Sequence, residues 1–537
     1  MVEISQPTAA SEGKTNQMSG GREKLFFFAA LLAAGTLYIL PITGSLYGDE
    51  AGHTYGVITT GHFWSNLLQP TMCHPPLFFI LAKAAYVLVG QLWAMRLPSL
   101  LFALGTVALG AWSSRDILGK EYFVPAAWLA ALSPFIASFA AEGRAYAMMI
   151  FFSLLTWWLF VRFIRSESFP AAIALALAAV GGGLTHYFFW FQLVFMGLAY
   201  LSMRRCVTRY SMIVVLVTIL CLAPFGILIF LVQDQQFSNY LQIEWLHAYF
   251  NPLNFLARLA VAVPFGYSTF NLPHLDPARN VALSMLGPNV VLLILAIIFF
   301  LVFGWSIFRI LRDRGSLSWL FVGGVAVPAF IGLALAMSGL YLIREKHLAI
   351  IWAPFFFLML MAGSRLKHWR AGWFSFGAYA ILIAVSLVHY SVFPHDYSRR
   401  MDWAGLEKTL AREVRPEDRV LVYLHTIKEA SKASARDGLS QFPEERLAPL
   451  LKSVPTPGDL AKDLDGSTKG ALFLIGDEAQ QNQVDPAGAL ISALRQRRSM
   501  KAERFGRNLV LLRFRSLGIK AEHDLDSGMT EGKKALP

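Results

Sequence analysis

The sequence is short of charge and of cysteine. Only 15% of its 537 residues are charged, whereas 55% are hydrophobic, and the mean hydropathy is +0.49. Soluble domains carry about a quarter charged residues, so an ordinary soluble enzyme is excluded, and the high hydrophobicity excludes a disordered chain. The three cysteines, Cys73, Cys206 and Cys221, allow neither a disulfide framework nor a zinc-binding pattern. Nucleotide-binding motifs are lacking too, since no Walker sequence occurs and no GxGxxG follows a strand.

What the sequence has instead is a series of long apolar runs, with aromatic residues making up 14% of the chain. Eleven runs approach or exceed the length needed to cross a membrane. They cover approximately 25–45, 97–113, 122–141, 146–163, 169–185, 188–203, 210–232, 288–308, 317–337, 347–363 and 371–392. We therefore predict an all-α polytopic membrane protein with about 11 transmembrane helices.

The net charge of +12 arises from Lys and Arg in small groups between the apolar runs, as membrane orientation requires and nucleic-acid binding does not. With the N-terminus inside, sixteen of these residues lie in inner segments and seven in outer segments before residue 394. This bias predicts a multi-pass protein of the cell inner membrane, with a cytoplasmic N-terminus and a periplasmic C-terminal region. Lys83 at the bilayer centre would cost about 2.5–3.5 kcal/mol, so the helix expected over 76–92 is placed at the membrane interface.

Four segments follow from composition. Residues 1–23 are predicted to be a disordered cytoplasmic tail, and 24–393 the transmembrane module, with its first outer loop at 46–95. A small extracytoplasmic α/β domain is predicted over 394–516, followed by a disordered tail at 517–537. Its expected strands are Val420–Tyr423, Ala471–Ile475 and Asn508–Phe514, and its expected helices cover 402–414 and 486–498.

Polar residues that suit chemistry gather at the predicted outer ends of the spans. Asp49 and Glu50 directly follow the first span, where adjacent acids either cap a helix N-terminus or supply a general base or metal ligand. His74 precedes a Pro-Pro pair that fixes an extended backbone before a helix. It is either an interfacial anchor or a donor to a phosphate or hydroxyl.

Two further outer junctions carry candidate residues. Glu142 and Arg144, followed by Tyr146, either pair with one another or bind a polar substrate. His186 and Tyr187 lie between the next two spans, where an interfacial aromatic belt is the alternative to a ligand-binding role.

The last candidate group precedes the tenth span and includes Tyr341, Arg344 and Lys346. Together with His347 it places three potential cations in four positions, against the positive-inside bias. An anionic ligand such as a lipid phosphate explains that departure, with headgroup binding without catalysis as the alternative.

The order of these motifs resembles the GT-C type membrane glycosyltransferases, most of all the protein mannosyltransferase and lipid A aminoarabinose transferase group (glycosyltransferase families 39 and 83). The motifs span about 25–390 and comprise the Asp49-Glu50 pair, His74-Pro75-Pro76-Leu77, Arg96-Leu97-Pro98-Ser99, Ser133-Pro134, Arg144-Ala145-Tyr146, His186-Tyr187 and Tyr341 with Arg344. The resemblance implies a transferase that uses a polyprenyl-phosphate sugar on the non-cytoplasmic face.

The resemblance also implies roles for three positions. Asp49 corresponds to the essential acid of the first outer loop, with Glu50 as its neighbour, and Arg344 to the group facing the donor phosphate. His74 corresponds to the histidine of the Pro-Pro motif. The sequence departs from the family pattern at two positions. The aminoarabinose group often has Lys before Pro-Pro, where this sequence has His74, and Tyr usually follows the Arg, where this sequence has Glu345. Both departures bear on the identity of the donor sugar more than on the reaction.

The predicted reaction is a single inverting displacement by a hexosyl- or pentosyltransferase. Asp49 would take the proton of the acceptor hydroxyl, while Arg344 and Lys346, with His74, stabilise charge on the phosphate. Asp49 with Glu142 could instead bind a divalent metal, the one cofactor considered. Acceptors could be lipid A, another lipid, a glycan or a protein, as in lipopolysaccharide or protein glycosylation.

Two rival functions remain. A transporter or flippase of lipid-linked sugars would place polar residues through the spans, whereas here they gather at the outer ends. A glycan polymerase or ligase would use a lipid diphosphate donor and also keep its site outside. No nucleic-acid partner is expected.

Overall fold

The computed structural model describes residues 20–42, 50–59, 61–67, 74–204, 206–241, 252–266, 290–312, 316–337, 345–366, 370–392, 403–414, 419–423, 472–477, 498–505 and 509–516. The chain divides into two compact units, residues 1–400 and 401–537, which are described separately. The sequence places this boundary after residue 393.

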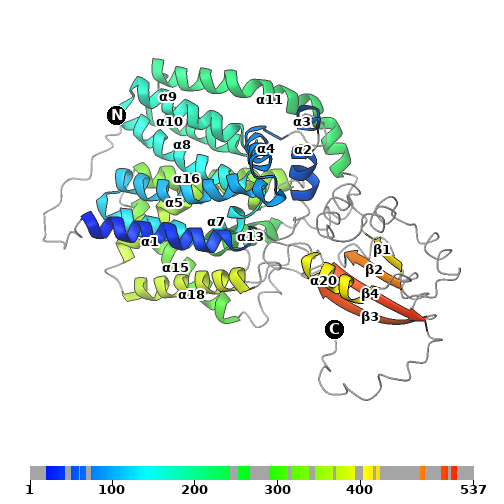
Figure 1. Ribbon diagram of the computed structural model, residues 1–537. Coiled ribbons are helices and arrows are strands. Elements are labelled where there is room, and N and C mark those ends of the chain that lie inside the picture. The colour runs from blue at the N-terminus through cyan, green and yellow to red at the C-terminus, as the bar shows by residue number, and fades with distance from the viewer. Residues whose placement is uncertain are drawn as a thin grey trace. The chain divides into compact units, whose positions relative to one another are not determined.

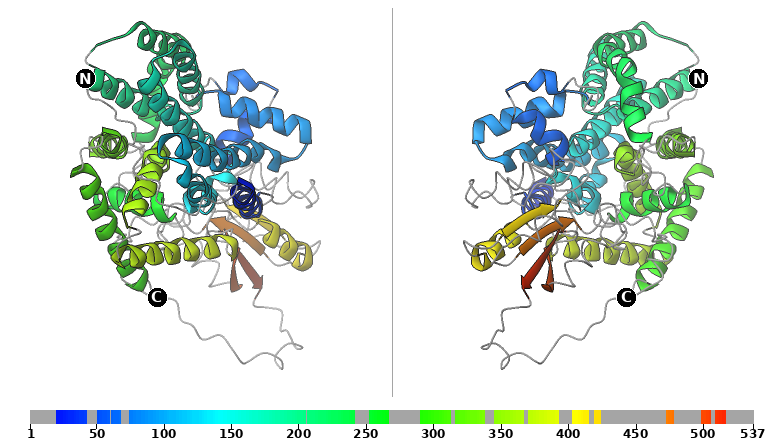
Figure 2. Two further views of the ribbon diagram at one scale, coloured as in Figure 1. Left: turned by 90° about the vertical axis from the view of Figure 1, so that its left-hand side faces the viewer. Right: turned by 90° about the vertical axis from the view of Figure 1, so that its right-hand side faces the viewer.

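The first unit is a bundle of helices that run side by side (Figures 1 and 2). Its longer helices are α1 (Gly20–Ile39), α4 (Leu77–Val89), α5 (Leu97–Ile117), α6 (Phe123–Ala131), α7 (Pro134–Ala140), α8 (Tyr146–Ser166), α9 (Phe169–Gly183), α10 (Phe189–Arg204), α11 (Arg209–Leu241), α13 (Pro252–Phe265), α15 (Val290–Arg312), α16 (Ser316–Met337), α17 (Trp352–Leu366) and α18 (Arg370–Val392). Short helical segments are η1 (Glu50–Tyr55), α2 (Gly56–Ile58), α3 (Phe63–Leu67), η3 (Leu92–Arg96), η4 (Lys120–Tyr122) and η5 (Glu345–Ile351).

The helical, multi-pass architecture predicted from the sequence is confirmed. Each of the eleven apolar runs coincides with a helix or a pair of helices. Six helices in the described part of the chain are long and apolar enough to cross a membrane by themselves, or seven if a bent pair is counted as one span. Helix α8 packs against α5 and α9, while α15 packs against α18 at the opposite side of the bundle from α11 (Figure 1).

Two details of the first unit differ from the predictions. Helix α1 begins at Gly20, so residues 20–23, predicted as part of a disordered tail, are helical. Glu23 lies in the first turn of this helix, where a negative charge is favourable. Helix α13 was not predicted, because its short apolar run is interrupted by Arg258.

The span at 122–141 is broken into α6 and α7, and the helix axis bends by 55° between them. Ser133 caps α7 by accepting a hydrogen bond from the Ile136 amide at 3.4 Å, with Pro134 in the first turn. The Tyr38 hydroxyl contacts the carbonyl oxygens of Ala130 and Ala131, each at 3.1 Å. The polar groups released by the break therefore find partners inside the bundle, as an apolar environment demands.

Helix α4 accommodates the charge in its middle. Lys83 Nζ donates to the carbonyl oxygen of Ile58 at 3.3 Å and lies 5.1 Å from the centre of the Phe63 ring. Val87 and Leu88 at the end of the helix are exposed. The predicted helix over 76–92 is thus present as α4, and Lys83 contacts the short helices α2 and α3. The location of α4 at the membrane interface stays a prediction.

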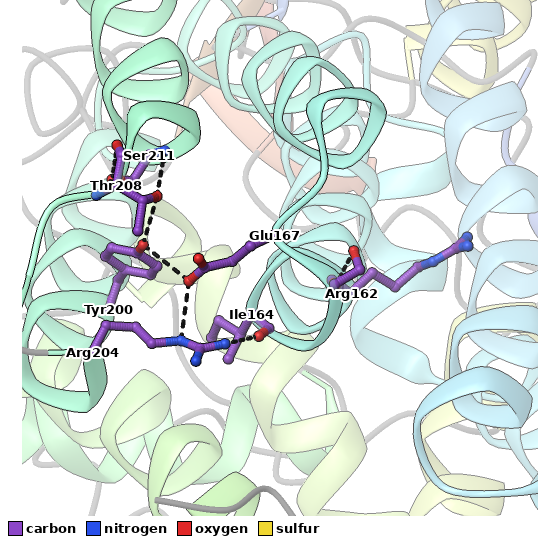
Figure 3. Close-up of polar contacts among 8 residues, drawn as sticks. Arg162, Ile164, Glu167, Tyr200, Arg204, Thr208 and Ser211 are labelled. Carbon is purple, nitrogen blue, oxygen red and sulfur yellow. Dashed lines mark hydrogen bonds and ion pairs between the residues drawn. The ribbon is translucent and has the colours of Figure 1, made fainter. Parts of the chain in front are cut away.

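A polar network joins the ends of α8 and α10 to the start of α11 (Figure 3). Glu167 follows α8 with φ of 38°, a left-handed conformation that a residue with a side chain rarely adopts. Its Oε1 accepts from the Tyr200 hydroxyl and from Arg204 Nε, both at 3.1 Å. Thr208 and Ser211 exchange hydrogen bonds at the start of α11, and Thr208 also contacts the Tyr200 hydroxyl at 3.1 Å.

The backbone conformation of Glu167 predicts different effects for two substitutions. Glu167→Ala removes both side-chain contacts and keeps the backbone strain, so we expect a loss of about 1–2 kcal/mol in stability. Glu167→Gly removes the same contacts but relieves about 1 kcal/mol of strain, so it should unfold at a higher temperature than the Ala variant. Thermal unfolding in detergent measures the difference; equal midpoints for the two variants would contradict it.

The second unit contains one helix and a sheet among its described residues. Helix α20 covers Trp403–Glu413, and the strands are β1 (Arg419–Tyr423), β2 (Leu472–Asp477), β3 (Arg498–Phe505) and β4 (Leu509–Ser516). The sheet order is β1-β2-β4-β3, with β1 parallel to β2 and the other pairs antiparallel. Arg513 on β4 pairs with Glu413 of α20 and with Glu503 of β3. Although burial acts to raise the pKa of Glu413, the bonds to Arg513 lower it overall.

Three strands and one helix of this α/β unit match the predictions. Strand β3 was missed because only three of its eight residues are apolar, as suits a strand at the edge of the sheet. Arg498, predicted as the end of a helix, is the first residue of this strand. Residues 486–497 and the predicted tails at 1–19 and 517–537 lie outside the described residues.

Candidate active site

A buried ion pair anchors the first outer loop. Arg96 at the end of η3 donates to both carboxylate oxygens of Glu50, from Nε at 2.9 Å and from Nη2 at 2.7 Å. Arg96 Nη1 also donates to the carbonyl oxygen of Ile42 at 2.6 Å. Both side chains of the pair are fully buried. The geometry is bidentate, the arrangement that gives an Arg–carboxylate pair its strength and directionality.

The loop between α7 and α8 is held by the same segment. The Gly143 amide donates to Glu50 Oε1, and the Thr54 hydroxyl donates to the Gly143 carbonyl at 2.7 Å. The Ser99 hydroxyl donates to the Arg144 carbonyl at 3.0 Å. Residues 50–54 and the start of α5 thus fix the backbone that carries Glu142 and Arg144.

Rings from four segments meet beside this loop. The His74 ring lies 6.0 Å from Tyr187 with parallel planes, and 6.1 Å from His186. The Tyr146 ring lies 5.7 Å from His186 and 6.2 Å from His347. His186 and His347 are themselves 5.8 Å apart. Residues that are far apart in the sequence therefore form one cluster of imidazole and phenol groups.

Two cations adjoin the cluster at Tyr146. Lys346 Nζ lies 5.2 Å from the centre of the Tyr146 ring, and Arg144 Cζ lies 6.0 Å from it. Both side chains belong to buried residues, each about 8% exposed. The result is a site with positive charge and ring donors together, which suits an anionic oxygen ligand.

Hydrogen bonds hold the contributing segments in place. Ser153 of α8 donates to Gln192 Oε1 at 2.6 Å and to the Ile350 carbonyl at 2.9 Å, which ties η5 to α8 and α10. The Leu77 amide donates to the Leu184 carbonyl at 3.0 Å, which joins the segment after His74 to the segment before His186. These bonds explain why segments so distant in sequence keep one arrangement.

His186 is held as a neutral imidazole with a defined tautomer. Its Nδ1 accepts from the Phe188 amide at 3.3 Å, so the ring proton is on Nε2. Burial, together with the nearby charges of Arg144 and Lys346, lowers the pKa of His186 to about 3. The ring therefore offers an N–H donor and no charge at neutral pH.

The lowered pKa of His186 predicts a pH-dependent stability. Because the unfolded chain protonates this histidine near pH 6.5 and the folded chain does not, the free energy of unfolding falls as the pH drops below 6.5. Between pH 7.5 and 5 this contribution is about 2 kcal/mol. His186→Gln should lose less thermal stability than the wild type over that range. Identical pH dependence in the His186 variant would contradict the assignment.

The structure brings together most of the predicted site residues that it describes. The ring and cation cluster contains His74, Arg144, Tyr146, His186, Tyr187 and Lys346. Glu50 and Glu142 lie on the two segments joined through Gly143. Asp49, Tyr341 and Arg344 lie outside the described residues. Within the described part of the chain, no three His, Cys, Asp or Glu residues converge as metal ligands.

Sequence reasoning missed three residues of this region. His347 stacks on Phe188 at 5.0 Å with nearly parallel planes, yet it had been noted only as a potential cation. Arg96 belongs to a motif to which the sequence assigns no role, and Thr54 has no predicted role. The ion pair of Arg96 with a residue 46 positions away leaves no local signal in the sequence.

Comparison with known proteins places the fold in a class. The family model described as dolichyl-phosphate-mannose-protein mannosyltransferase matches residues 73–230. ArnT from Cupriavidus metallidurans in the apo state is similar over 92% of this chain and 98% of its own, with 13% identity and a TM-score of 0.54. No curated protein matches the chain in sequence.

Two further solved structures resemble the chain more loosely. ArnT from Cupriavidus metallidurans bound to undecaprenyl phosphate has 15% identity and a TM-score of 0.43, covering 92% of this chain and 98% of that chain. The oligosaccharyltransferase AglB from Archaeoglobus fulgidus, in complex with an inhibitory peptide and a dolichol-phosphate, has 12% identity and a TM-score of 0.42, with coverage of 94% and 75%.

The likeness to apo ArnT shows that the chain has a GT-C type fold, and the resemblance predicted from the sequence to GT-C type membrane glycosyltransferases is confirmed. The segment matched by the mannosyltransferase family model includes His74, Arg144, Tyr146, His186 and Tyr187. The family match therefore covers most of the cluster, whereas Lys346 and His347 lie beyond the matched residues.

Proposed function

We propose that the chain transfers a single sugar from a polyprenyl-phosphate donor to a lipid, glycan or protein acceptor. The observation that carries the proposal is the convergence of Arg144 and Lys346 with three histidines and two tyrosines at one place in the bundle. A phosphate with an attached sugar needs both charge and directional donors, which this cluster supplies. The matched family is described by a dolichyl-phosphate sugar, a donor of the same chemical class.

The donor phosphate would lie against the cations of the cluster. Arg144 and Lys346, joined by Arg344, would hold its anionic oxygens by charge-assisted hydrogen bonds. His74 and the Nε2–H of His186 would donate without adding charge, and Tyr187 and Tyr341 would complete the site. Because a lipid phosphate is a good leaving group, stabilising its charge is the main demand on these residues.

Asp49 would act as the general base. The acceptor oxygen attacks the anomeric carbon, its proton passes to Asp49, and the bond from the anomeric carbon to the phosphate oxygen breaks with both electrons leaving on the polyprenyl phosphate. One displacement of this kind inverts the anomeric centre. Glu50, the next residue in the sequence, uses both of its oxygens in the pair with Arg96, which leaves the role of base to Asp49.

A divalent cation bound by Asp49 and Glu142 is the other use of these carboxylates. Glu142 adjoins Gly143, whose amide binds Glu50, the residue that follows Asp49 in the sequence. Sensitivity of transfer to a chelator separates this arrangement from simple base catalysis.

The reaction is placed at the outer face of the cell inner membrane. This location rests on the positive-inside bias, which puts the N-terminus in the cytoplasm and residues 394–516 in the periplasm. The class of enzyme is a hexosyl- or pentosyltransferase.

A donor panel tests the proposal. Purified wild-type protein would receive short-chain polyprenyl-phosphate hexoses and pentoses, the corresponding diphosphate-linked sugars, and lipid, glycan and peptide acceptors. We expect transfer from a monophosphate donor to one acceptor class. Turnover of the diphosphate donors alone would favour a polymerase or ligase. No turnover, with movement of labelled donor lipid across liposomes, would favour a flippase and overturn the proposal.

A further inference from the structure

Tyr146 is approached by both cations of the site. It is the first residue of α8 and is 1% exposed. Lys346 reaches its ring from η5 and Arg144 from the preceding loop, at the distances of 5.2 and 6.0 Å given above. Both distances fall within the range of about 6 Å over which a cation is attracted to an aromatic ring. The ring is therefore shared by two positive charges from separate segments.

Other rings keep the plane of Tyr146 in place. Phe139 of α7 lies 5.2 Å from it, and His186 and His347 approach from two further segments. A ring packed on several sides has little rotational freedom, whereas Lys and Arg side chains have long flexible stems. Contact with a fixed ring reduces the entropy that the cations would lose on meeting a ligand.

We propose that Tyr146 is a positioning residue, whose ring holds Arg144 and Lys346 as a prearranged pair for the phosphate of the donor. The inference rests on the proposed function and reassigns Tyr146 from direct substrate binding to action through the two cations. The negative face of the ring attracts each of the two cations. On this account the ring matters and the hydroxyl does not.

Three variants of the full-length protein separate ring from hydroxyl. Tyr146→Phe and Tyr146→Trp keep a ring without the phenol, while Tyr146→Leu keeps an apolar side chain without a ring. The measurements are kcat and KM for a short-chain polyprenyl-phosphate sugar, and the Kd of the sugar-free polyprenyl phosphate at several salt concentrations. Lys346→Met, alone and combined with Tyr146→Leu, completes a double-mutant cycle.

We expect the substitutions at Tyr146 to change the KM of the donor and to leave the KM of the acceptor unchanged. Tyr146→Phe should stay within about threefold of the wild type, and Tyr146→Leu should raise the donor KM and the Kd about tenfold, with the acceptor KM unchanged. The salt dependence of polyprenyl-phosphate binding should weaken in Tyr146→Leu. The Lys346→Met substitution should raise the Kd by a smaller factor in the Tyr146→Leu background than in the wild type.

Several outcomes would overturn the inference. A loss in Tyr146→Phe equal to that in Tyr146→Leu would assign the effect to the hydroxyl, and additive effects of Tyr146→Leu and Lys346→Met would remove the link to the cation. If Tyr146→Leu does not fold, a tenfold loss in both ring-bearing variants would also overturn it. A wild type that neither binds polyprenyl phosphate nor transfers sugar would overturn the proposed function as well, whereas an active wild type with an unaffected Leu variant would overturn this inference alone.

Discussion

Replacing Asp49 by Asn should lower kcat for sugar transfer by about 10²–10⁴, the range over which general base catalysis contributes. Asn preserves the size of the side chain and removes its ability to accept a proton. The affinity for polyprenyl phosphate should stay within a few-fold of the wild type, because the cations of the cluster are intact. Single-turnover transfer with purified protein measures the first quantity, and lipid titration the second.

A matched acid elsewhere provides the control for this variant. Asp116 at the end of α5 accepts from Trp158 Nε1 at 2.8 Å and is remote in the sequence from every site residue. Asp116→Asn should transfer sugar at the wild-type rate. A folded Asp49→Asn protein with full activity would rule out the base, and loss of wild-type activity in chelator would transfer the role of Asp49 to metal binding.

Replacing Glu50 by Gln should be among the most destabilising single changes in the bundle. It removes the carboxylate charge that pairs with the fully buried guanidinium of Arg96 and weakens the acceptor for the Gly143 amide. Breaking a buried pair from one side costs about 3–5 kcal/mol. Thermal unfolding in detergent should therefore show a large drop in the midpoint, together with loss of activity because the Arg144 loop is released.

Two comparisons isolate the buried charge as the cause. The combined Glu50→Gln and Arg96→Met variant removes both charges, so it should be more stable than Glu50→Gln alone. The Arg162–Asp116 pair is exposed, with a separation of 3.9 Å, and Arg162→Gln should cost less than about 1 kcal/mol. A Glu50→Gln protein as stable as the wild type would contradict an anchoring role.

The length of the apolar runs was sufficient to predict the helical bundle. The runs at 97–113 and 146–163 became α5 and α8, because a lipid environment leaves few alternatives to a helix. The break at Ser133 was not predicted, although Ser133-Pro134 had been quoted as a motif. Two side chains bind the backbone and the cap at this break. The Tyr38 hydroxyl donates to the Ala130 carbonyl, and Trp352 Nε1 donates to Ser133 Oγ at 3.1 Å. Such a break depends on contacts between distant segments.

The candidate site was predictable in outline and not in its contacts. His74, His186 and Lys346 were expected to share a site because each lies at a predicted outer end. In the structure, His186 and Lys346 both lie beside Tyr146, and His74 lies beside His186. The role of Arg96 could not be predicted, because its partner is set by how η1 folds against η3. His347 was overlooked because only its stacking on Phe188 distinguishes it from an interfacial charge.

The most direct test is the stoichiometry of a single reaction. Purified protein in lipid nanodiscs would receive a polyprenyl-phosphate donor with a labelled sugar and an acceptor identified in the donor panel. We predict one polyprenyl phosphate released for each labelled sugar found on the acceptor, with inverted anomeric configuration, by the wild type and not by Asp49→Asn. Labelled acceptor without release of polyprenyl phosphate, or donor lipid that changes leaflet with its sugar still attached, would contradict the account.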